Sequence, residues 1–448
     1  MPELTVPWGD EPLELALPAH WTVGQVAQPS LQPAEGDWPE RLARALGQPE
    51  AGLSLQQLLA ARRSGRIALV VEDLTRHSPL ERILTVLLRE IAHARIGLDQ
   101  VEVVFATGMH PPLTTEKAAQ KLGPLAHSLA WRSHNAFDAA AHVHLGQVAQ
   151  VPIELDRQLM AADLRIVVSS VSPHLQAGFG GGYKMFLPGC ASLATIRQLH
   201  KLGVDRHPRP LVGTESHRNP MRQAIEAGGA MADAHHGKTF AVQYLLDDAD
   251  QPAYLAVGEM DAAQAMLAKQ CAVGCGIVIG QPGDVLITNA YPRDFDLWQC
   301  LKSVANTRWA VRPGGVIICL ARCPSGIGMS VPRWPLSPAA TRRAVQILGH
   351  DALASMLTRW VPRLAGDAAF FVRLALQAIH RNPILLVSPR LVADGVRFPG
   401  LELHAQVEQA FARADEILQH GPSKVLVFPS GGTTYPVLPV RPDAQRKS

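Results

Sequence analysis

At 448 residues the chain is long for a single hydrophobic core, so its length predicts two domains. Its 42 lysines and arginines against 39 aspartates and glutamates leave a net charge of +3, which gives no support to nucleic-acid binding or polybasic membrane binding. The first residues carry no basic secretion signal and no run of roughly 18 apolar residues occurs, so we expect a soluble cytoplasmic protein. The six cysteines are expected to be reduced thiols, because their two CxxxC pairs lack the CxxC spacing of zinc sites.

The first part of the chain alternates between strand and helix patterns. Residues 3–18 predict a hairpin that turns at Gly9 and Asp10. The patterns that follow predict a helix in 51–64, a strand at 67–73, a helix from Pro79 to Ala94, a strand at 101–106, a helix at 114–123, a weaker strand–helix section at 128–163 and a strand at 164–171. Because strands alternate with helices, we expect an α/β domain with a largely parallel sheet.

The same alternation continues to the C-terminus, and a second domain begins near Ile277. Before that point we expect a helix at 191–202, a short helix after Asn219-Pro220, a strand at 239–248 and a strand that runs into a helix at 253–273. After it we expect strands at 283–290, 314–321, 384–389 and 424–429 and a helix at 406–419. The fold class is therefore α/β, with two α/β domains of largely parallel sheets, residues 1–276 and 277–448, and an interdomain active-site cleft.

Reactive side chains follow three strands of the first domain. The segment 72–77 contains Arg76, the segment 107–110 ends in His110, and the segment 172–174 ends in His174. In open α/β sheets ligands bind outside the carboxyl ends of the strands, so we expect one shared active site there. The alternative is that these segments are helix caps and turns, which does not account for an arginine and two histidines together.

A glycine-rich loop follows His174 and leads to Lys184. It is not a Walker A loop, because Tyr183 precedes the lysine and Met185 follows it, and it does not fit GxGxxG either. Its backbone N–H groups could wrap an anion such as a nucleotide phosphate, although a glycine-rich hairpin is the plainer explanation. Apolar neighbours favour partial desolvation of Lys184, which promotes its neutral, nucleophilic form.

Two more candidate groups lie on predicted helices. His200 follows Arg197 by three residues, so the two lie on one helix face. Gln299 and Lys302 have i, i+3 spacing and so face the same way, which suits binding of a carboxylate and a hydroxyl. A solvated helix face is an equally good explanation of that second pair.

The motifs together resemble the lactate racemase family, whose members racemise or epimerise 2-hydroxy acids with a nickel-pincer nucleotide. The matching segments occur in family order across nearly the whole chain: DLTR at 73–76, TGMH at 107–110, HLQAGFGGGYKMFLPG at 174–189, the helix to His200, GTESHRNP at 213–220 and QxxK at 299–302.

The resemblance implies a role for each candidate residue. It implies the cofactor pyridinium-3-thioamide-5-thiocarboxylic acid mononucleotide with nickel, which some members attach covalently at the position of Lys184 and others bind noncovalently. The implied roles are nickel ligation by His200, acid/base catalysis by His110 and His174, substrate binding by Arg76, Gln299 and Lys302, and cofactor binding by Asp73, Thr75, Gly178, Gly180, Gly181 and Gly182. It also implies a small 2-hydroxy acid as substrate and partner proteins that make and supply the cofactor.

The implied chemistry is physically reasonable. A carboxylate barely acidifies the neighbouring C–H bond, so removal of the hydrogen as hydride is easier than removal as a proton. The resulting 2-keto acid is planar and can accept the hydride on either face, while a histidine on each side exchanges the hydroxyl proton. Imidazole titrates near neutral pH and can act as acid or base there.

Some features depart from the family pattern or leave alternatives open. His77-Ser78-Pro79 and Pro111 differ from the segments common in the family, so the hydroxy acid need not be lactate. Trp298 or Trp360 is a candidate to close the pocket. The other histidines, such as His134 and His142, are expected to be non-catalytic. Two other functions remain: a zinc hydrolase that uses His110, His174 and His200, and a non-catalytic protein that binds the nucleotide.

Overall fold

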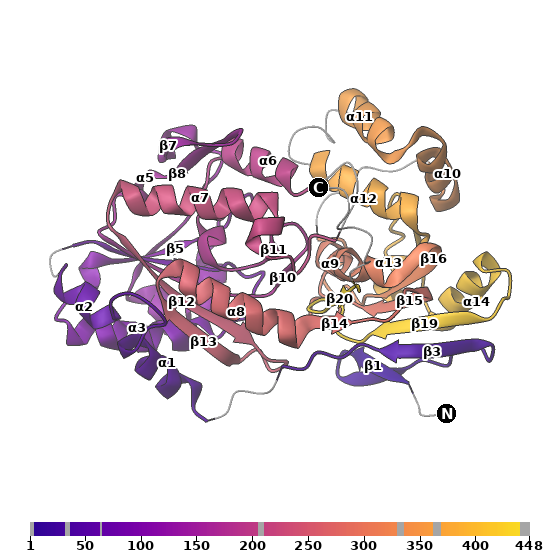
Figure 1. Ribbon diagram of the computed structural model, residues 1–448, viewed down its shortest axis with the longest axis horizontal. Coiled ribbons are helices and arrows are strands. Elements are labelled where there is room, and N and C mark those ends of the chain that lie inside the picture. Colours follow the sequence, from indigo (N-terminus) through magenta and orange to yellow (C-terminus); the bar gives the residue numbers. More distant parts are fainter. Residues whose placement is uncertain are drawn as a thin grey trace. The chain divides into compact units, whose positions relative to one another are not determined.

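The structure is a computed structural model that describes residues 4–31, 36–62, 65–204, 210–328, 336–361 and 369–439. Its contacts divide the chain into two compact units (Figure 1). We call them the N-terminal unit, Leu31–Gly203 with Gly213–Ala272, and the C-terminal unit, Met1–Ser30 with Val204–Val212 and Val273–Ser448. None of the described helices is long and apolar enough to cross a membrane.

The N-terminal unit contains a six-stranded sheet. Its spatial order is β13 (Pro252–Gly258), β12 (Lys238–Leu246), β9 (Leu164–Ser170), β4 (Ile67–Val71), β5 (Val101–Phe105) and β6 (Ala130–Ser133). All neighbouring pairs are parallel except β12 and β13. Every residue of β4 and β9 is buried, as expected for central strands that helices cover on both faces.

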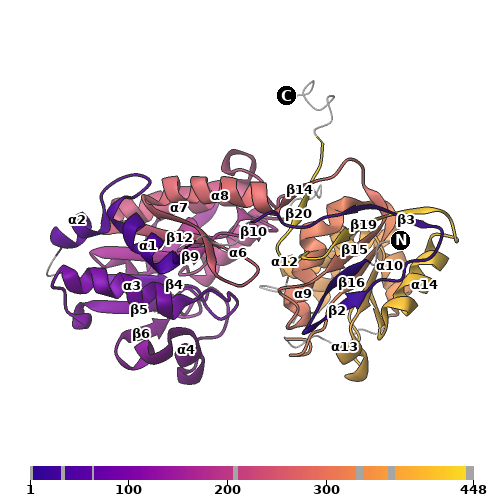
Figure 2. The ribbon, with the colours of Figure 1, turned by 90° about the horizontal axis from the view of Figure 1, so that it is seen from below.

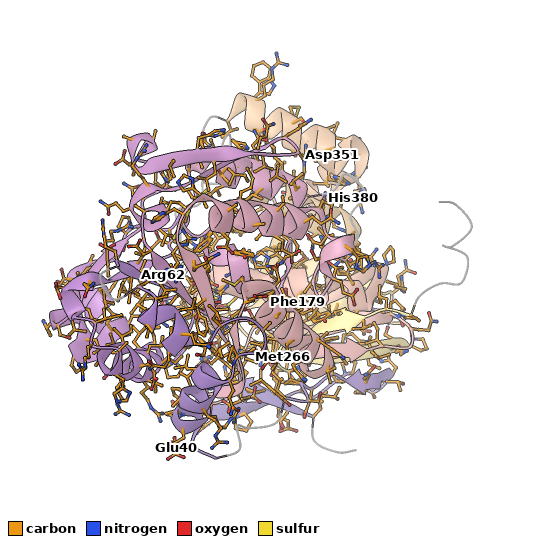
Figure 3. The ribbon with its side chains drawn as sticks, turned by 60° about the vertical axis from the view of Figure 1, so that its left-hand side comes forward. Glu40, Arg62, Phe179, Met266, Asp351 and His380 are labelled. Atoms are coloured by element: carbon orange, nitrogen blue, oxygen red, sulfur yellow. The ribbon has the colours of Figure 1, made fainter. Side chains whose placement is uncertain are left out.

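Helices cover both faces of this sheet. The core on one face joins strand residues to α1 (Trp38–Gly47), α2 (Leu55–Ala60), α3 (Leu80–His93) and α4 (Thr115–Leu122). On the other face Arg165 of β9 bonds to residues of α7 (Pro220–His235), and α8 (Met260–Cys275) lies on the same side of the sheet as α7 (Figure 2). The exposed Glu40 of α1 lies at the edge of the unit, whereas Phe179 is buried in its interior (Figure 3).

The unit also contains several short strands, the short helix α5 and the longer helix α6. They are the antiparallel pair β7 (His142–Val148) and β8 (Val151–Asp156), the antiparallel pair β10 (Pro173–His174) and β11 (Gly178–Phe179), α5 (Arg157–Met160) and α6 (Leu193–Leu202). Helix α6 begins where the Ser192 hydroxyl accepts a hydrogen bond from the N–H of Thr195. Helix α4 begins after the Thr114 cap and ends at Gly123, as its sequence predicts.

The C-terminal unit contains a second six-stranded sheet, which is entirely parallel. Its order is β18 (Leu401–His404), β17 (Ile384–Val387), β16 (Val311–Leu320), β15 (Gly283–Asn289), β19 (Ser423–Phe428) and β3 (Trp21–Val26). Its helices are α9 (Leu297–Thr307), α10 (Pro338–Leu348), α11 (His350–Trp360), α12 (Ala369–Arg381), α13 (Pro389–Ala393) and α14 (Val407–Ile417). The predicted α/β class with two largely parallel sheets is confirmed.

Three smaller features complete this unit. The predicted N-terminal hairpin is present as β1 (Thr5–Trp8) and β2 (Glu11–Glu14), and β14 (Gly276–Val278) pairs with β20 (Tyr435–Val437). All six cysteines are buried free thiols.

The structure differs from the sequence-based description in two places. The sequence-based division puts residues 1–276 in one domain. In the structure, residues up to Ser30 belong to the C-terminal unit instead, because β3 pairs with β19 of that unit. Only Trp21 of β3 is buried, so this edge strand has little hydrophobic pattern to reveal it. The helix after Asn219-Pro220 has 16 residues and is not short. Its Gly228-Gly229 pair, unfavourable in an isolated helix, is accommodated by close packing.

Gly229 permits helix α7 to approach the glycine-rich loop. A Cβ atom at this position would lie 2.1 Å from Cγ of Tyr183. We therefore expect Gly229→Ala to lower the free energy of unfolding by about 1–3 kcal/mol through overpacking. Gly47 on α1 has open space where a Cβ would lie, so Gly47→Ala is the matched control and should be neutral or stabilising by up to about 1 kcal/mol. Urea unfolding followed by tryptophan fluorescence compares the two, and equal stability of both variants would contradict the packing argument.

Candidate active site at the strand ends of the N-terminal unit

Asp73 joins the ends of two neighbouring strands. It lies two residues after β4, where its Oδ1 accepts a hydrogen bond from the N–H of Thr75 at 3.0 Å. Its Oδ2 lies 2.6 Å from Nδ1 of His110, which follows β5. Burial raises the pKa of Asp73, but the hydrogen bond and positive charge of His110 outweigh it and hold that pKa well below its usual range. The predicted meeting of these strand-end residues is confirmed for Asp73 and His110.

The two candidate acid/base histidines have different hydrogen-bond partners. Nδ1 of His174 accepts hydrogen bonds from the backbone N–H groups of Gln176 at 3.3 Å and Ala177 at 3.0 Å. An accepting Nδ1 carries no proton, so we assign the ring proton of His174 to Nε2. His110 faces a carboxylate with its Nδ1, which places a proton there and leaves Nε2 as the acceptor in the neutral ring. The two rings are therefore preset in opposite tautomers.

The glycine-rich loop is tightly packed against the interior. Gly181 and Gly182 have φ angles of 73° and 66°, which favour glycine. A Cβ on Gly181 would lie 2.9 Å from Cγ2 of Val171, and one on Gly182 would lie 2.6 Å from Oε1 of Gln264. The backbone N–H of Gly180 donates to the carbonyl of Ser172. Packing and backbone conformation thus account for Gly181 and Gly182. The antiparallel pair β10 and β11 is the glycine-rich hairpin that the sequence analysis gave as the plainer explanation of this pattern.

Arg222 of α7 holds this loop from the inside. Its guanidinium donates to the carbonyls of Ala177 at 3.2 Å, Gly181 at 3.4 Å and Phe179, and only 3% of the residue is exposed. Burial lowers its pKa to about 10, so it stays charged at neutral pH. Sequence reasoning missed this residue. The only signal was an arginine among apolar residues in the first turn of a helix.

Lys184 lies in a positive environment with nearby carboxylates. It belongs to the short 3-10 helix Gly182–Met185 and is partly buried. Burial and the charges of Arg76 and Arg222 lower its pKa to about 7, while Asp73 and Glu72 oppose this shift. At neutral pH a large fraction of this lysine is therefore the neutral amine. The desolvation that the sequence predicted is confirmed.

His200 lies near the C-terminal end of α6, close to the turn that follows His174. The amide of Gln176 donates to the backbone carbonyl of His200 at 3.3 Å. Ile196, one turn earlier in the same helix, is fully buried, whereas His200 is partly exposed. Within the described ranges, no three His, Cys, Asp or Glu side chains form a group that could hold a metal ion. The zinc site required by the hydrolase alternative is thus missing among these residues.

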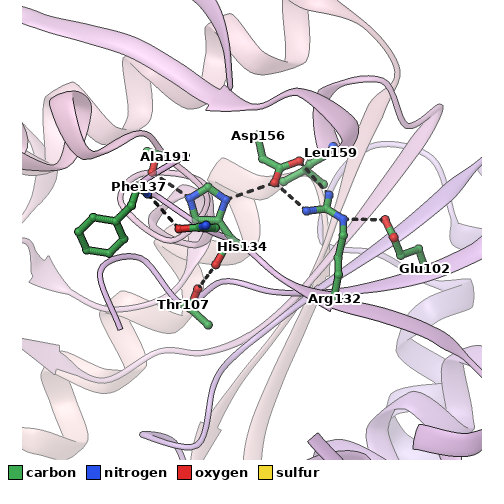
Figure 4. A network of polar contacts seen from close by, with 9 residues as sticks. Glu102, Thr107, Arg132, His134, Phe137, Asp156, Leu159 and Ala191 are labelled. Carbon is green, nitrogen blue, oxygen red and sulfur yellow. Dashed lines mark hydrogen bonds and ion pairs between the residues drawn. The ribbon is translucent and has the colours of Figure 1, made fainter. Parts of the chain in front are cut away.

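A buried polar network fixes the start of α6 (Figure 4). Arg132 donates two hydrogen bonds to Asp156 at 2.7 and 2.8 Å and one to Glu102 at 3.1 Å. His134 is fully buried, with Nδ1 3.2 Å from Oδ2 of Asp156 and Nε2 2.9 Å from the carbonyl oxygen of Ala191. Both ring nitrogens of His134 therefore have a hydrogen-bond partner within the network. Through the Ala191 carbonyl, His134 holds the segment before α6.

Gln299 and Lys302 lie on α9 of the C-terminal unit. Asp296 caps this helix by accepting from the N–H of Gln299 at 2.8 Å. Nζ of Lys302 donates to Oε1 of Gln299, so the two side chains do lie together as their spacing predicted.

Comparison with known proteins gives one family. The Lactate racemase N-terminal domain model matches residues 8–213, and the Lactate racemase C-terminal domain model matches residues 277–434. The chain is 25% identical over 406 residues to a lactate racemase of Lactiplantibacillus plantarum, covering 88% of this chain and 89% of that protein. It is 26% identical over 340 residues to a lactate racemase of Thermoanaerobacterium thermosaccharolyticum, covering 73% and 76%.

Two solved structures share the fold. The lactate racemase apoprotein from Thermoanaerobacterium thermosaccharolyticum superposes with a TM-score of 0.80 at 20% identity, covering 98% of this chain and 100% of that one. A protein from Thermotoga maritima superposes with a TM-score of 0.64 at 18% identity, covering 90% and 98%.

The buried network around Asp156 predicts a pH-dependent stability. Burial raises the pKa of Asp156, but hydrogen bonds from His134 and Arg132 lower it more, so its net pKa is depressed. A depressed pKa adds stability that is complete above the ordinary aspartate pKa of about 3.9 and is lost as the pH falls below it. We expect Asp156→Asn to cost about 1–3 kcal/mol at pH 7, because buried His134 and partly exposed Arg132 lose a charged hydrogen-bond partner.

Unfolding of the wild type and Asp156→Asn at pH 7 and at several values below pH 4 measures this difference. It should be largest at pH 7 and shrink in acid. Asp138→Asn is the control, because Asp138 is exposed and asparagine also caps its short helix. A difference that does not change with pH would show that Asp156 acts only through its shape.

Proposed function

The chain belongs to the lactate racemase family, and from this premise we propose that it is an isomerase that inverts C2 of a 2-hydroxy acid. The observation that carries the proposal is the Asp73–His110 pair at the strand ends, beside the charges of Arg76 and Lys184. This arrangement combines a proton acceptor, a carboxylate-binding cation and a reactive amine within one unit. An enzyme that inverts a hydroxy acid through its keto acid needs the first two of these groups.

The described residues fit a nickel-pincer nucleotide. Arg76 and Arg222 give the surroundings of Lys184 a positive potential, which suits an anionic nucleotide. The partly neutral Lys184 amine suits attachment to a thioacid carbon. Because the described residues form no metal site by themselves, His200 would supply one nickel ligand and the organic group the others. When bound, this group supplies a hydride acceptor and donor. The proteins that synthesise it are the partners we expect.

The two histidines have distinct starting roles in this proposal. His110, backed by the Asp73 carboxylate, presents Nε2 as the base that accepts the hydroxyl proton, and Asp73 stabilises the imidazolium that forms. His174 presents Nε2–H and so begins as a hydrogen-bond donor to the substrate oxygen. Asp73 therefore acts through His110, in addition to the cofactor-binding role that the sequence suggested for it. The roles of Thr75 and the glycines at 178 and 180–182 in binding the cofactor stay predictions.

Cationic side chains account for binding of the substrate carboxylate. Among the hydrogen bonds of the described residues, the guanidinium of Arg76 donates only to Thr75, which leaves further N–H groups for a carboxylate. Gln299 and Lys302 present an amide beside an ammonium group, and we propose a substrate-binding role for this pair as well. His77, which is exposed, and Pro111 differ from the family pattern, so the substrate class is 2-hydroxy acids in general.

A non-catalytic nucleotide-binding protein is the second candidate. It would require the loss of a catalytic group, yet His110, His174 and Arg76 are all present and His110 retains its carboxylate partner. These observations favour the enzyme.

Isotope incorporation tests the reaction type. The protein, purified from a host that makes the pincer nucleotide, is incubated with single enantiomers of 2-hydroxy acids in deuterated water. Chiral chromatography with mass spectrometry follows the products. We expect inversion without deuterium at C2, because hydride transfer keeps the substrate hydrogen. Full deuterium incorporation at C2 would indicate proton abstraction. If none of the tested hydroxy acids is inverted, the proposed function is wrong.

Nickel content separates the proposed roles of two histidines. His200→Ala should lose bound nickel, because it removes the protein ligand. His174→Ala should keep nickel and lose turnover by about 10²–10⁴-fold, the usual value of an acid/base group. His93→Ala, an exposed position on α3, is the control and should change neither. Nickel is measured by mass spectrometry of the metal, and the same outcome for His174→Ala and His200→Ala would contradict the division of roles.

A further inference from the structure

Glu72 is a buried carboxylate directly before the Asp73 turn. Its Oε1 accepts hydrogen bonds from the N–H of Ser170 at 2.8 Å and from the hydroxyl of Ser170 at 2.5 Å. Its Oε2 accepts from the hydroxyls of Tyr244 at 3.0 Å and Ser78 at 3.2 Å. Only 5% of the residue is exposed. Among the described residues, four hydrogen-bond donors thus surround this one carboxyl group.

Lys121 of α4 is a buried cation on the other side of Ser78. Its Nζ donates to the carbonyl of Arg76 at 2.5 Å and to the hydroxyl of Ser78 at 3.1 Å, and 7% of the residue is exposed. The Ser78 hydroxyl thus accepts from Lys121 and donates to Glu72. These three side chains form a continuous chain of hydrogen bonds between opposite charges in the interior.

This chain connects the segments that carry the site. Residues 73–77, with Asp73 and Arg76, lie between Glu72 and Ser78 in the sequence. Lys121 lies on the helix that follows the His110 segment, and Ser170 ends the strand that precedes His174. Because Lys121 bonds to the backbone of Arg76, it fixes the turn and not only the side chains.

We propose that Glu72, Ser78 and Lys121 form a buried relay that positions the Asp73–Arg76 turn. The inference rests on the proposed function, in which Arg76 and Lys184 act at the site. The relay residues are positioning residues, since none of them is proposed to touch the substrate.

The charge at one end of the relay has a consequence that can be measured at Lys184. Four charged groups act on Lys184: Arg76 and Arg222 disfavour its ammonium form, while Asp73 and Glu72 favour it. Removal of the Glu72 charge would leave both cations and one anion, so the amine would lose its proton at a lower pH. A purely structural role of Glu72 has no such consequence. Replacement of a buried ion pair by apolar residues often leaves stability unchanged, so stability alone does not require these charges.

Amine labelling tests the relay without any turnover. The full-length protein, prepared without the pincer nucleotide, is treated briefly with acetic anhydride at pH 5.5 to 9, and acetylation of Lys184 is measured by peptide mass spectrometry. The wild type should show a labelling midpoint near pH 7. We expect Glu72→Gln to lower this midpoint by about 1 pH unit. Glu116→Gln, an exposed carboxylate in the first turn of α4, should leave it unchanged. An unchanged midpoint in folded Glu72→Gln overturns the assignment of Glu72 as the charged end of the relay.

Ser78→Ala tests the positioning part and replaces Glu72→Gln if that variant fails to fold. It breaks the middle of the relay and leaves both charges. We expect amide hydrogen exchange of Thr75 and Arg76 to accelerate about tenfold, while exchange in α14 of the other unit stays the same. Unchanged exchange at 73–77 overturns the inference.

Kinetics of the cofactor-loaded enzyme provides an independent readout. Lys121→Met should raise KM for the hydroxy acid several-fold more than it lowers kcat, because Arg76 is displaced, and Lys121→Arg should restore part of the loss. Equal loss in Lys121→Met and Lys121→Arg would count against positioning. If labelling shifts as expected but no inversion occurs, the relay stands and the proposed function fails.

Discussion

The short contact between the Asp73 carboxylate and His110 is the interaction on which the candidate site depends. It joins the segments that follow β4 and β5, two neighbouring strands, at the carboxyl edge of a parallel sheet. The carboxylate also bonds Thr75 and so shapes the turn that presents Arg76. One buried negative charge thus fixes the tautomer of a histidine and the path of a cation-bearing turn.

The interior around this contact contains an unusual number of charges, and their balance decides the chemistry. Arg222, Lys121 and Lys184 are cations in a region of low dielectric, where each would be costly without compensation. Arg222 is compensated by loop carbonyls, Lys121 by Ser78 and a carbonyl, and Lys184 only in part. Burial and the charges of Arg76 and Arg222 lower the pKa of the Lys184 amine, and the two carboxylates offset this only in part. The lowered pKa of Lys184 is therefore a property of the whole cluster.

The glycines of the glycine-rich loop meet two structural requirements, one of backbone conformation and one of packing. Its glycines are required by positive φ angles and by contacts with Val171 and Gln264 that leave no room for a Cβ. Gly228 and Gly229 of α7 serve the same need from the other side, against Leu187 and Tyr183. The loop can therefore be rigid before any ligand binds, which favours precise placement of Lys184.

The sequence by itself determined the α/β class, the central strands and the capped helices, because hydrophobic period and cap residues are local signals. It also identified the strand-end residues, since parallel strands bring their carboxyl ends to one edge whatever the loops do. Only the tertiary structure decided that β3 joins the second sheet and that Arg222, Glu72 and Lys121 support the site. Edge pairing and burial of charge depend on contacts between residues far apart in the chain. A local sequence pattern does not show which carboxylate will lie beside a buried cation in the folded protein.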